Sequence, residues 1–594
     1  MKKSYPFNNI KSLKLSKKIY FFTLFSLFLV NLQGESPLRS VDLSKQKPSW
    51  QAVIGGEAVA PAVETSYGFA VVSDGRMVST CTSRGNVMWQ KGVKGRPSNW
   101  FSAWGDFLYL VTNKSILNLV NPSGYTVWSK DCGFEVTATP VTGWDGRIFV
   151  QGNENLSCYG YNGVLKWNLS VSPLNSLPLC QFSDGSLIVF LAKTKDSKTT
   201  GLHISPFGKI IEEITFAGQI ITAAQCENGV LMTFSDGSFG LCTVENKAAV
   251  SKWVQHDSRA SGGIPCIISS QDKSALLYNI DHQLKVLIIE NKTGNLLNSF
   301  NAGKINATSL KHFRATDGGF FVSDYSRAIE FTEDGTINWE ASLPSSNLWK
   351  YMIYTSNNQI LICMNDWVLN AFVMSQTINS KTEKKVSAKK YITPSKLIQK
   401  YDGVIYSTPS LAHFQEINSI LTRDNYGEQE EQICSELKEQ TENYLSELKS
   451  HTGISHNNHT YYSTNPLFTQ TILDSISKTG TNLFVSDLAE LLTLEDDPLL
   501  LNSLIVTAGN NGFDQNGRIL HAFEHVTVKK ISKKDFNSAK LLCDSTYEIV
   551  KFMGRPALYK QGKAILANFM YPQYDKPIRD YARATLTKIV ELEM

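Results

Sequence analysis

Four stretches of the chain share one pattern, a glycine followed four residues later by a tryptophan. They are Gly85-Asn-Val-Met-Trp89, Gly124-Tyr-Thr-Val-Trp128, Gly163-Val-Leu-Lys-Trp167 and Gly335-Thr-Ile-Asn-Trp339. The first three tryptophans are 39 residues apart, and Trp50 lies another 39 residues upstream. Trp253 stands 86 residues from both Trp167 and Trp339, which is two periods of 43. A period near 40 built from short strands is typical of a β-propeller, in which each repeat forms one four-stranded blade.

The spacing predicts eight blades over residues 47–378. Two of these units keep the glycine, at Gly208 and Gly294, and lack the tryptophan. Asp-Gly turns recur between the predicted strands, at 74–75, 145–146, 184–185, 236–237, 317–318 and 334–335, as hairpins require. The last blade has no fourth strand of its own. We therefore expect Trp50 to Gly55 to supply that strand and to close the ring.

The tryptophans are predicted to be structural. On an outermost strand a large indole can lie in the seam between two blades, with its glycine in the turn that directs it. The predicted structural tryptophans are Trp50, Trp89, Trp128, Trp167, Trp253 and Trp339.

Eight units of this length with Gly-x-x-x-Trp strand endings resemble the quinoprotein-type propeller, whose repeat is named after pyrroloquinoline quinone. The resemblance implies one of two functions. Alcohol and sugar dehydrogenases of this family bind the quinone and Ca²⁺ on the propeller axis. Non-catalytic relatives, such as the outer-membrane assembly lipoprotein, use the ring as an interaction platform. The dehydrogenases commonly carry two adjacent cysteines, and none of the ten cysteines here is adjacent to another, so the resemblance favours the non-catalytic branch and no cofactor.

Composition excludes several other classes of protein. The chain has 594 residues, 42% hydrophobic and 19% charged, which is ordinary for globular domains. Its formal charge is +4, but residues 1–34 hold six lysines and no acid, so the remainder is near −2. Nucleic-acid binding requires a basic domain or stripe, and we expect none. The cysteines show no Cys-x-x-Cys spacing for a zinc ribbon.

The amino terminus resembles an export signal. Lys17 and Lys18 precede an uncharged run over residues 19–30, which is too short to span a bilayer. We expect residues 1–34 to be a signal peptide cleaved between Gly34 and Glu35, followed by a lead segment over 35–46. An uncleaved anchor is the alternative. Because the first cysteine is Cys81, a lipid anchor is not expected, and the protein is predicted to be exported, periplasmic and soluble.

After the ring the period changes from strands to helices. Seven lysines fall between Ser375 and Lys400, and residues 379–407 are interpreted as a basic linker. Weak contact with anionic lipid headgroups is the alternative for this linker. Residues 408–594 are predicted to form a helical domain that resembles HEAT repeats, with proline in the first turn of three helices. The expected helices cover 428–449, 468–477, 483–492, 498–508, 517–526, 536–553, 556–569 and 577–592. The charge of the first is expected to form a solvated face.

Two histidine patterns resemble metal sites. His521-Ala-Phe-Glu524-His525 matches the His-x-x-Glu-His pattern of a zinc peptidase family. The alternative is the polar face of an ordinary helix, and no third ligand follows. His451, His456 and His459 fall in a polar stretch that we interpret as an exposed loop. No metal site is therefore predicted.

These observations favour a non-enzymatic scaffold. Two repeat architectures without a catalytic group of residues predict protein partners, with cell-envelope assembly as the expected setting. A quinone-dependent dehydrogenase and a sensor of small ligands or glycans in the central channel are the two alternative functions.

Overall fold

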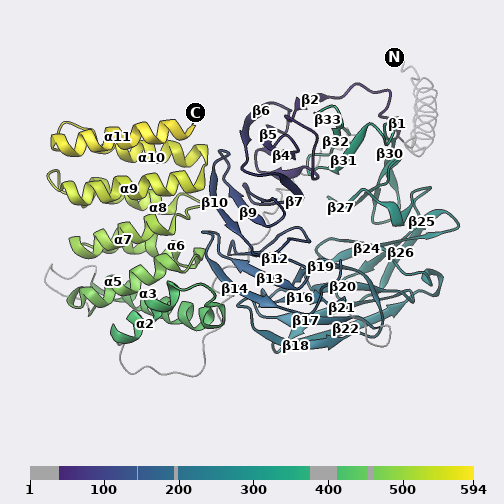
Figure 1. Ribbon diagram of the computed structural model, residues 1–594, viewed down its shortest axis with the longest axis horizontal. Helices are drawn as coiled ribbons and strands as arrows, with labels where there is room; N and C mark the ends of the chain where they lie inside the picture. The colour runs from purple at the N-terminus through teal and green to yellow at the C-terminus, as the bar shows by residue number, and fades with distance from the viewer. Residues whose placement is uncertain (1–38, 144, 193–197, 375–410, 452–460, 594) are drawn as a thin grey trace, which may run out of the picture.

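The computed structural model describes residues 39–143, 145–192, 198–374, 411–451 and 461–593. Within them the chain forms a ring of eight β-sheets and then a stack of α-helices beside the ring (Figure 1). The predicted fold class, an eight-bladed β-propeller followed by a helical domain, is confirmed. The predicted signal peptide, its cleavage site at Gly34 and Glu35, and the basic linker 379–407 lie outside the described residues.

Blades 1 to 6 each contain four consecutive antiparallel strands. Blades 1 and 2 are β3 (Val63–Thr65), β4 (Gly68–Ser73), β5 (Met77–Thr82), β6 (Val87–Gly92), β7 (Pro97–Trp104), β8 (Phe107–Thr112), β9 (Ile116–Val120) and β10 (Thr126–Asp131). Blades 3 and 4 are β11 (Val141–Thr142), β12 (Ile148–Gln151), β13 (Asn155–Tyr159), β14 (Leu165–Ser170), β15 (Cys180–Gln181), β16 (Leu187–Phe190), β17 (Thr200–Ile204) and β18 (Ile210–Thr215). Blades 5 and 6 are β19 (Ile220–Cys226), β20 (Gly229–Phe234), β21 (Ser238–Glu245), β22 (Ala248–His256), β23 (Cys266–Ser269), β24 (Lys273–Ile280), β25 (Gln283–Glu290) and β26 (Leu296–Asn301).

Blade 8 closes the ring with a strand from the other end of the propeller. It contains β31 (Trp349–Tyr354), β32 (Gln359–Met364) and β33 (Val368–Val373), with β2 (Trp50–Val53) as its outer strand. Trp50 lies opposite Ala371, and Val53 lies opposite Val368, in an antiparallel pair. The predicted closure is confirmed, and it covers edges that would otherwise be unpaired.

Blade 7 gains a fifth strand that the sequence analysis did not assign. It contains β27 (His312–Thr316), β28 (Gly319–Ser323), β29 (Arg327–Thr332) and β30 (Ile337–Ser342). β1 (Arg39–Asp42) pairs with β30 in parallel, with Arg39 opposite Trp339 and Asp42 opposite Ser342. The four residues of β1 show no regular alternation of polar and apolar side chains, so their sequence does not predict a strand. The strand forms by pairing with β30, which is distant in the sequence.

The sequence of each strand follows its position in the blade. Middle strands such as β4 and β8 are buried at every residue, because both faces of a blade pack against neighbouring blades. This explains their continuous apolar sequences. The outer strand β6 alternates between exposed and half-buried residues. Its tryptophan is thus the main apolar group that it contributes to the seam.

Five of the six indoles lie against a glycine of the following blade. A Cβ on Gly294 would lie 2.5 Å from Cε3 of Trp253. The same contact joins Trp50 to Gly85, Trp89 to Gly124, Trp128 to Gly163 and Trp167 to Gly208. The sequence spacing predicts that each glycine directs its own tryptophan, whereas in the structure the close contact of the glycine is with the ring of the preceding blade. Only a residue without a side chain allows this approach.

Indole N–H groups form hydrogen bonds across the same seams. Nε1 of Trp89, Trp128, Trp167 and Trp253 donates to a backbone oxygen of the next blade at 2.7, 2.8, 3.0 and 3.1 Å. In the two blades that lack a tryptophan, a polar side chain takes its place. Glu212 accepts a hydrogen bond from the backbone N–H of Ala249 at 2.6 Å, and Asn298 donates to the Glu333 carbonyl at 3.4 Å. Trp339 is buried against Phe321 and Tyr354.

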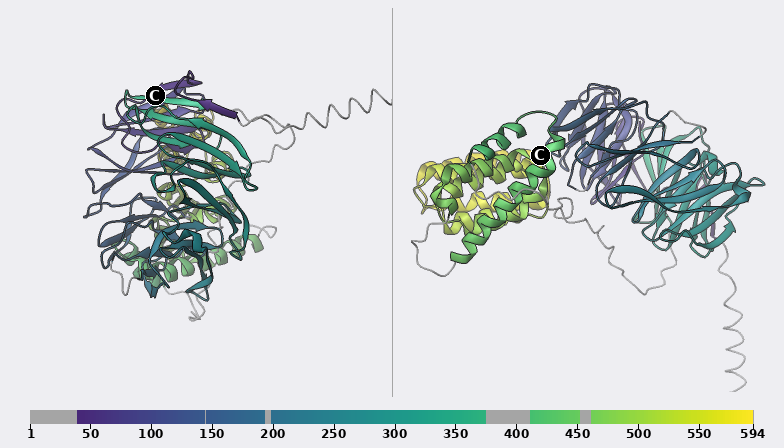
Figure 2. Two further views of the ribbon diagram at one scale, coloured as in Figure 1. Left: turned by 90° about the vertical axis from the view of Figure 1, so that its right-hand side faces the viewer. Right: turned by 90° about the horizontal axis from the view of Figure 1, so that it is seen from below.

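The helical region contains two stacked layers of helices. Its helices are α2 (Leu411–Leu421), α3 (Gly427–His451), α4 (Tyr461–Thr464), α5 (Pro466–Lys478), α6 (Val485–Leu494), α7 (Pro498–Asn511), α8 (Arg518–Lys529), α9 (Phe536–Met553), α10 (Pro556–Phe569) and α11 (Lys576–Glu593). The helices α5, α7, α9 and α11 stack in one layer, and α6, α8 and α10 stack in the other. Figure 2 shows these layers beside the ring rather than across its centre.

Local sequence explains most helix boundaries. Asp497 caps α7 by accepting from the N–H groups of Leu499 and Leu500, and Pro498 occupies its first turn. Gly512 and Gly554, both in the left-handed conformation, end α7 and α9. The sequence analysis did not assign α2 and α4, which lie on either side of α3.

The contribution of the indole contact can be separated from that of the backbone conformation. Gly294 and Gly133 have similar φ angles, +73° and +76°, but a Cβ on Gly133 would meet nothing within 4 Å. Gly133→Ala should lower the free energy of unfolding by about 1–2 kcal/mol through backbone strain alone. Gly294→Ala should lower it by about 1–3 kcal/mol more, because its Cβ overlaps the indole. Urea unfolding of both variants tests this, and equal losses would contradict it.

Candidate functional site

The helical region and the ring share one hydrophobic core. Trp104 of blade 2 stacks on Phe513 at 5.4 Å between ring centroids, and Phe107 contacts Phe552 at 5.6 Å. Tyr161 of blade 3 contacts Phe513 at 5.1 Å and Phe552 at 5.6 Å between ring centroids. One cluster of buried side chains therefore continues from blades 2 and 3 into the helices. The two repeat architectures are joined as a single packed body.

Turns of the ring bind the helix ends through specific polar contacts. The Asn121 side chain donates to the Lys551 carbonyl and Ser123 donates to the Gly554 carbonyl, each at 2.8 Å. The Tyr161 hydroxyl lies 2.9 Å from the Asn511 carbonyl. These ring residues belong to turns between the third and fourth strands of their blades. The helices thus meet the ring at that end of the strands.

A buried ion cluster lies at the same junction. Glu430 of α3 contacts Lys166 of blade 3, and its Oε1 lies 3.2 Å from Nη2 of Arg147. Arg147 also pairs with Asp145 at 2.7 Å. All four side chains are at most 5% exposed, so two cations and two acids are balanced away from water. Burial alone would raise the pKa of Asp145, but the adjacent Arg147 guanidinium lowers it to about 2.

This cluster corrects one expectation for α3. The sequence analysis assigned its charge to a solvated face, yet Glu430 is 1% exposed. The reason is that the first turn of α3 packs against blade 3, where Lys166 and Arg147 supply its partners. Nothing within the α3 sequence distinguishes Glu430 from the exposed Glu428. The partners lie more than 260 residues away, and only tertiary structure identifies them.

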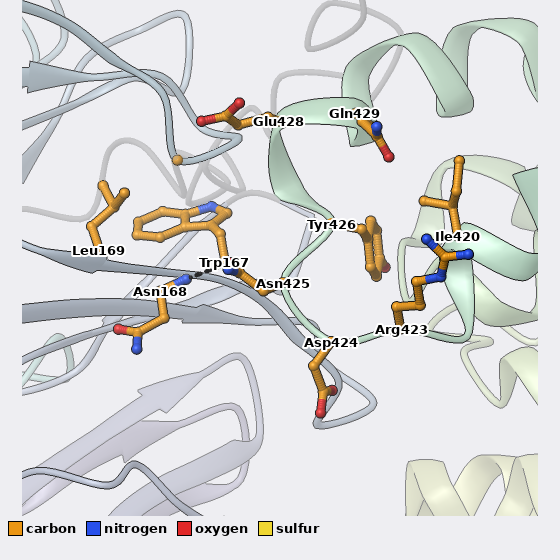
Figure 3. Close-up of a pocket in the computed structure, with 11 residues that line it drawn as sticks. Trp167, Asn168, Leu169, Ile420, Arg423, Asp424, Asn425, Tyr426, Glu428 and Gln429 are labelled. Carbon is orange, nitrogen blue, oxygen red and sulfur yellow. Dashed lines mark hydrogen bonds between the residues drawn. The ribbon is translucent and has the colours of Figure 1, made fainter.

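A pocket of about 320 Å³ opens beside this cluster (Figure 3). Trp167, Asn168, Leu169 and Gly208 form its ring side. The α2–α3 segment forms its other side with Ile420, Arg423, Asp424, Asn425, Tyr426, Glu428 and Gln429. Asn425 bridges the two sides, because its backbone N–H donates to the Leu165 carbonyl at 3.2 Å and its Oδ1 accepts from the Asn168 N–H at 3.0 Å. Asn425 adopts a left-handed φ of +65° to do so.

The structure places the predicted tryptophans in the seams of the ring. Trp50, Trp89, Trp128, Trp253 and Trp339 lie between blades, and Trp167 additionally borders the pocket. The sequence analysis did not identify Arg147, Lys166, Asn425 or Glu430. Their types and spacing match no motif, and they come together only because the helices fold back on blade 3.

A second candidate surface lies at the opposite end of the strands, at blades 7 and 8. We name Val53, Tyr325, Leu348 and Trp367 the blade 7–8 patch. Their exposed fractions are 60, 45, 49 and 57%. Tyr325 and Trp367 lie in the turns between the second and third strands of blades 7 and 8, respectively. Leu348 lies in the connection between the two blades, and Val53 is the last residue of β2. Both blades lie away from the helices in Figure 1.

Backbone hydrogen bonds and one ring contact join the segments that carry the blade 7–8 patch. The Trp367 carbonyl accepts from the N–H of Ile54, next to Val53, at 3.0 Å, and the Leu348 carbonyl accepts from the Asn365 N–H at 3.0 Å. Tyr325 packs on Trp349, next to Leu348, at 5.9 Å. Trp367 has a φ of +69°, which is rare for a bulky residue. The turn therefore holds a large exposed indole in a strained conformation.

The histidine motif lies on an open helix surface. His521 and Glu524 of α8 are 82 and 46% exposed, with 4.0 Å between Nδ1 and Oε2. Among the described residues, no three His, Cys, Asp or Glu side chains come together as metal ligands would. His456 and His459 lie outside the described residues. No helix in the described part of the chain has the length and apolar character needed to cross a bilayer.

Comparison with known proteins yields likenesses to solved structures only. No family model and no curated protein matches the chain. BamB from Moraxella catarrhalis is 13% identical, with 56% of this chain and 98% of that chain covered and a TM-score of 0.41. Sqt1 from Chaetomium thermophilum, bound to the N-terminus of the ribosomal protein L10, is 11% identical, with 55% and 100% covered and a TM-score of 0.41. The fold of the chain itself defines its class, an eight-bladed β-propeller protein with a C-terminal helical region.

Removing one member of the ion cluster should destabilise the junction. Glu430→Gln leaves Lys166 buried without a carboxylate, and we expect the free energy of unfolding to fall by about 3–5 kcal/mol. Glu428→Gln, on the exposed side of the same turn, should change it by less than about 0.5 kcal/mol. Thermal unfolding and protease sensitivity of the two variants provide the measurement.

A double variant separates charge burial from simple loss of a contact. Lys166→Met combined with Glu430→Met removes both ions, so it should be more stable than Glu430→Gln alone. If Glu430→Gln melted like Glu428→Gln, the cluster would have no role in holding the two parts together.

Proposed function

We propose that this protein is an exported, non-enzymatic scaffold that binds protein partners, in cell-envelope assembly. The observation that carries the proposal is the blade 7–8 patch. Tryptophan and tyrosine are the residues that most often dominate the energy of protein interfaces. Trp367 and Tyr325 are exposed and lie outside the seams that hold the ring together.

The chemistry around Tyr325 supports a protein partner. Nζ of Lys311 lies 3.7 Å from the centroid of the Tyr325 ring, and Lys311 forms no ion pair with any residue that the structure describes. A cation held over an aromatic ring beside aliphatic side chains suits a segment that offers an apolar side chain next to a carboxylate. The shared core at blades 2 and 3 supports the scaffold role, since it gives the patch a fixed position relative to the helices.

Sequence features support the finer parts of the proposal. The uncharged run over residues 19–30 behind Lys17 and Lys18 supports export. The indole seams support kinship with the non-catalytic quinoprotein-type propellers, and the two stacked helix layers support a HEAT-like array. The lack of adjacent cysteines supports a ring without quinone chemistry.

Crosslinking in intact cells tests the proposal. A partner crosslinked to the wild-type protein in the envelope fraction should be recovered about tenfold less with Trp367→Ala combined with Tyr325→Ala, because hot-spot residues are lost. Tyr571→Ala removes an aromatic side chain that is 58% exposed on the helical region, and it should leave recovery unchanged. Mass spectrometry of the same fraction should find a chain beginning at Glu35.

Three results would overturn the proposal. One is that nothing is crosslinked above background, and another is equal recovery with the patch variant. The third is a raised melting temperature with pyrroloquinoline quinone plus Ca²⁺ or with sugars, since a ligand that binds only the native state stabilises it. That result would favour the dehydrogenase or the ligand sensor instead.

A further inference from the structure

Outer blade edges of this ring accept additional chain. Blade 7 carries β1 as a fifth strand, with four residue pairs against β30. At blade 3, one residue of the α2–α3 segment binds the outer edge in the same way. Asn425 forms hydrogen bonds with Leu165 and Asn168 of β14. β14 is otherwise the last strand of its sheet, and no strand of the described chain pairs with its outer edge.

Beyond Asn425, the outward main-chain groups of β14 have no hydrogen-bond partner among the residues that the structure describes. In an antiparallel strand, successive residues direct their N–H and C=O groups alternately toward the paired strand and away from it. The Asn168 N–H bonds outward to Asn425, whereas the N–H of Val171 bonds inward to Glu154. The outward groups are therefore the Asn168 carbonyl and the N–H and carbonyl of Ser170. Both residues are exposed.

The pocket in Figure 3 gives this edge room for a ligand. Its volume of about 320 Å³ lies directly beside Asn168 and Leu169, between β14 and the start of α3. Across the pocket stand the exposed side chains of Arg423, Asp424 and Glu428. None of these three forms an ion pair within the described chain. A strand added to a sheet lies about 4.7–4.9 Å from its neighbour, and Asn168 and Leu169 of this edge line the pocket.

We infer that this edge binds an extended polypeptide segment of a partner by β-augmentation. The segment continues the pairing that Asn425 begins, accepts a hydrogen bond from the Ser170 N–H, and donates to the Asn168 carbonyl. Recognition is through the main chain, as in other strand-addition sites. The lining carries both signs of charge, so it suits a polar segment with charged side chains rather than an apolar one. The inference depends on the proposed function only in that the partner is a protein, and it uses a site separate from the blade 7–8 patch.

Proline at position 170 provides a direct test. Ser170→Pro removes the outward N–H and leaves the inward hydrogen bonds of β14 in place, since proline is tolerated where the missing N–H faces outward on an edge strand. Ser170→Ala is the matched control, because it keeps the N–H. The probe is a synthetic peptide selected from a random-sequence library on the full-length protein.

The expected result is that Ser170→Pro weakens binding of this peptide about tenfold, as loss of a hydrogen bond predicts, while Ser170→Ala binds like the wild type. In the unsubstituted protein, the peptide should slow hydrogen exchange at the Ser170 amide, which tests the site even if Ser170→Pro does not fold. Trp367→Ala should bind the peptide normally. Unchanged exchange at Ser170, equal binding by Ser170→Pro, or a library that yields no peptide would overturn the inference and leave the blade 7–8 patch untouched.

Discussion

The contact between an indole ring and a glycine of the next blade is the constraint on which the rest of the structure depends. Each blade is a small sheet that cannot bury both faces alone, so its stability comes from its neighbours. The indole fills the outer part of that seam, and the missing Cβ of the glycine lets the ring approach within van der Waals contact. Where tryptophan is absent, Glu212 and Asn298 keep the seam closed by bonding to the next blade's backbone.

The junction with the helices uses a different combination of forces. The aromatic contacts of Trp104, Phe107 and Tyr161 provide apolar burial between the ring and the helices. The Asp145–Arg147–Glu430–Lys166 cluster adds little net stability when intact, because desolvation of each ion offsets the attraction. Its effect is on orientation, since any other position of α3 would leave charges buried without partners. The hydrophobic core therefore supplies the strength of the attachment between the helices and the ring, and the ion cluster fixes the orientation of the helices.

The indole seams and the junction with the helices leave separate parts of the molecular surface exposed. The helices occupy the rim at blades 2 and 3, at one end of the strands, and the blade 7–8 patch lies at the other end on the far side of the ring. Edges of the outer strands form a third kind of surface. β1 covers one of them, and Asn425 begins to cover another. The proposed scaffold would use these separate surfaces to bind separate partners.

The amino-acid sequence by itself determined the period, the number of blades, the closing strand at Trp50 and the limits of most helices. These features depend on local patterns, because alternation, turn glycines and first-turn prolines act over a few residues. Only the tertiary structure decided that β1 joins blade 7, that Glu430 is buried beside Lys166, and that Val53, Tyr325, Leu348 and Trp367 form one patch. Each of these joins residues far apart in the chain, and their contacts arise from packing of whole blades and helices. No spacing along the sequence encodes such a contact.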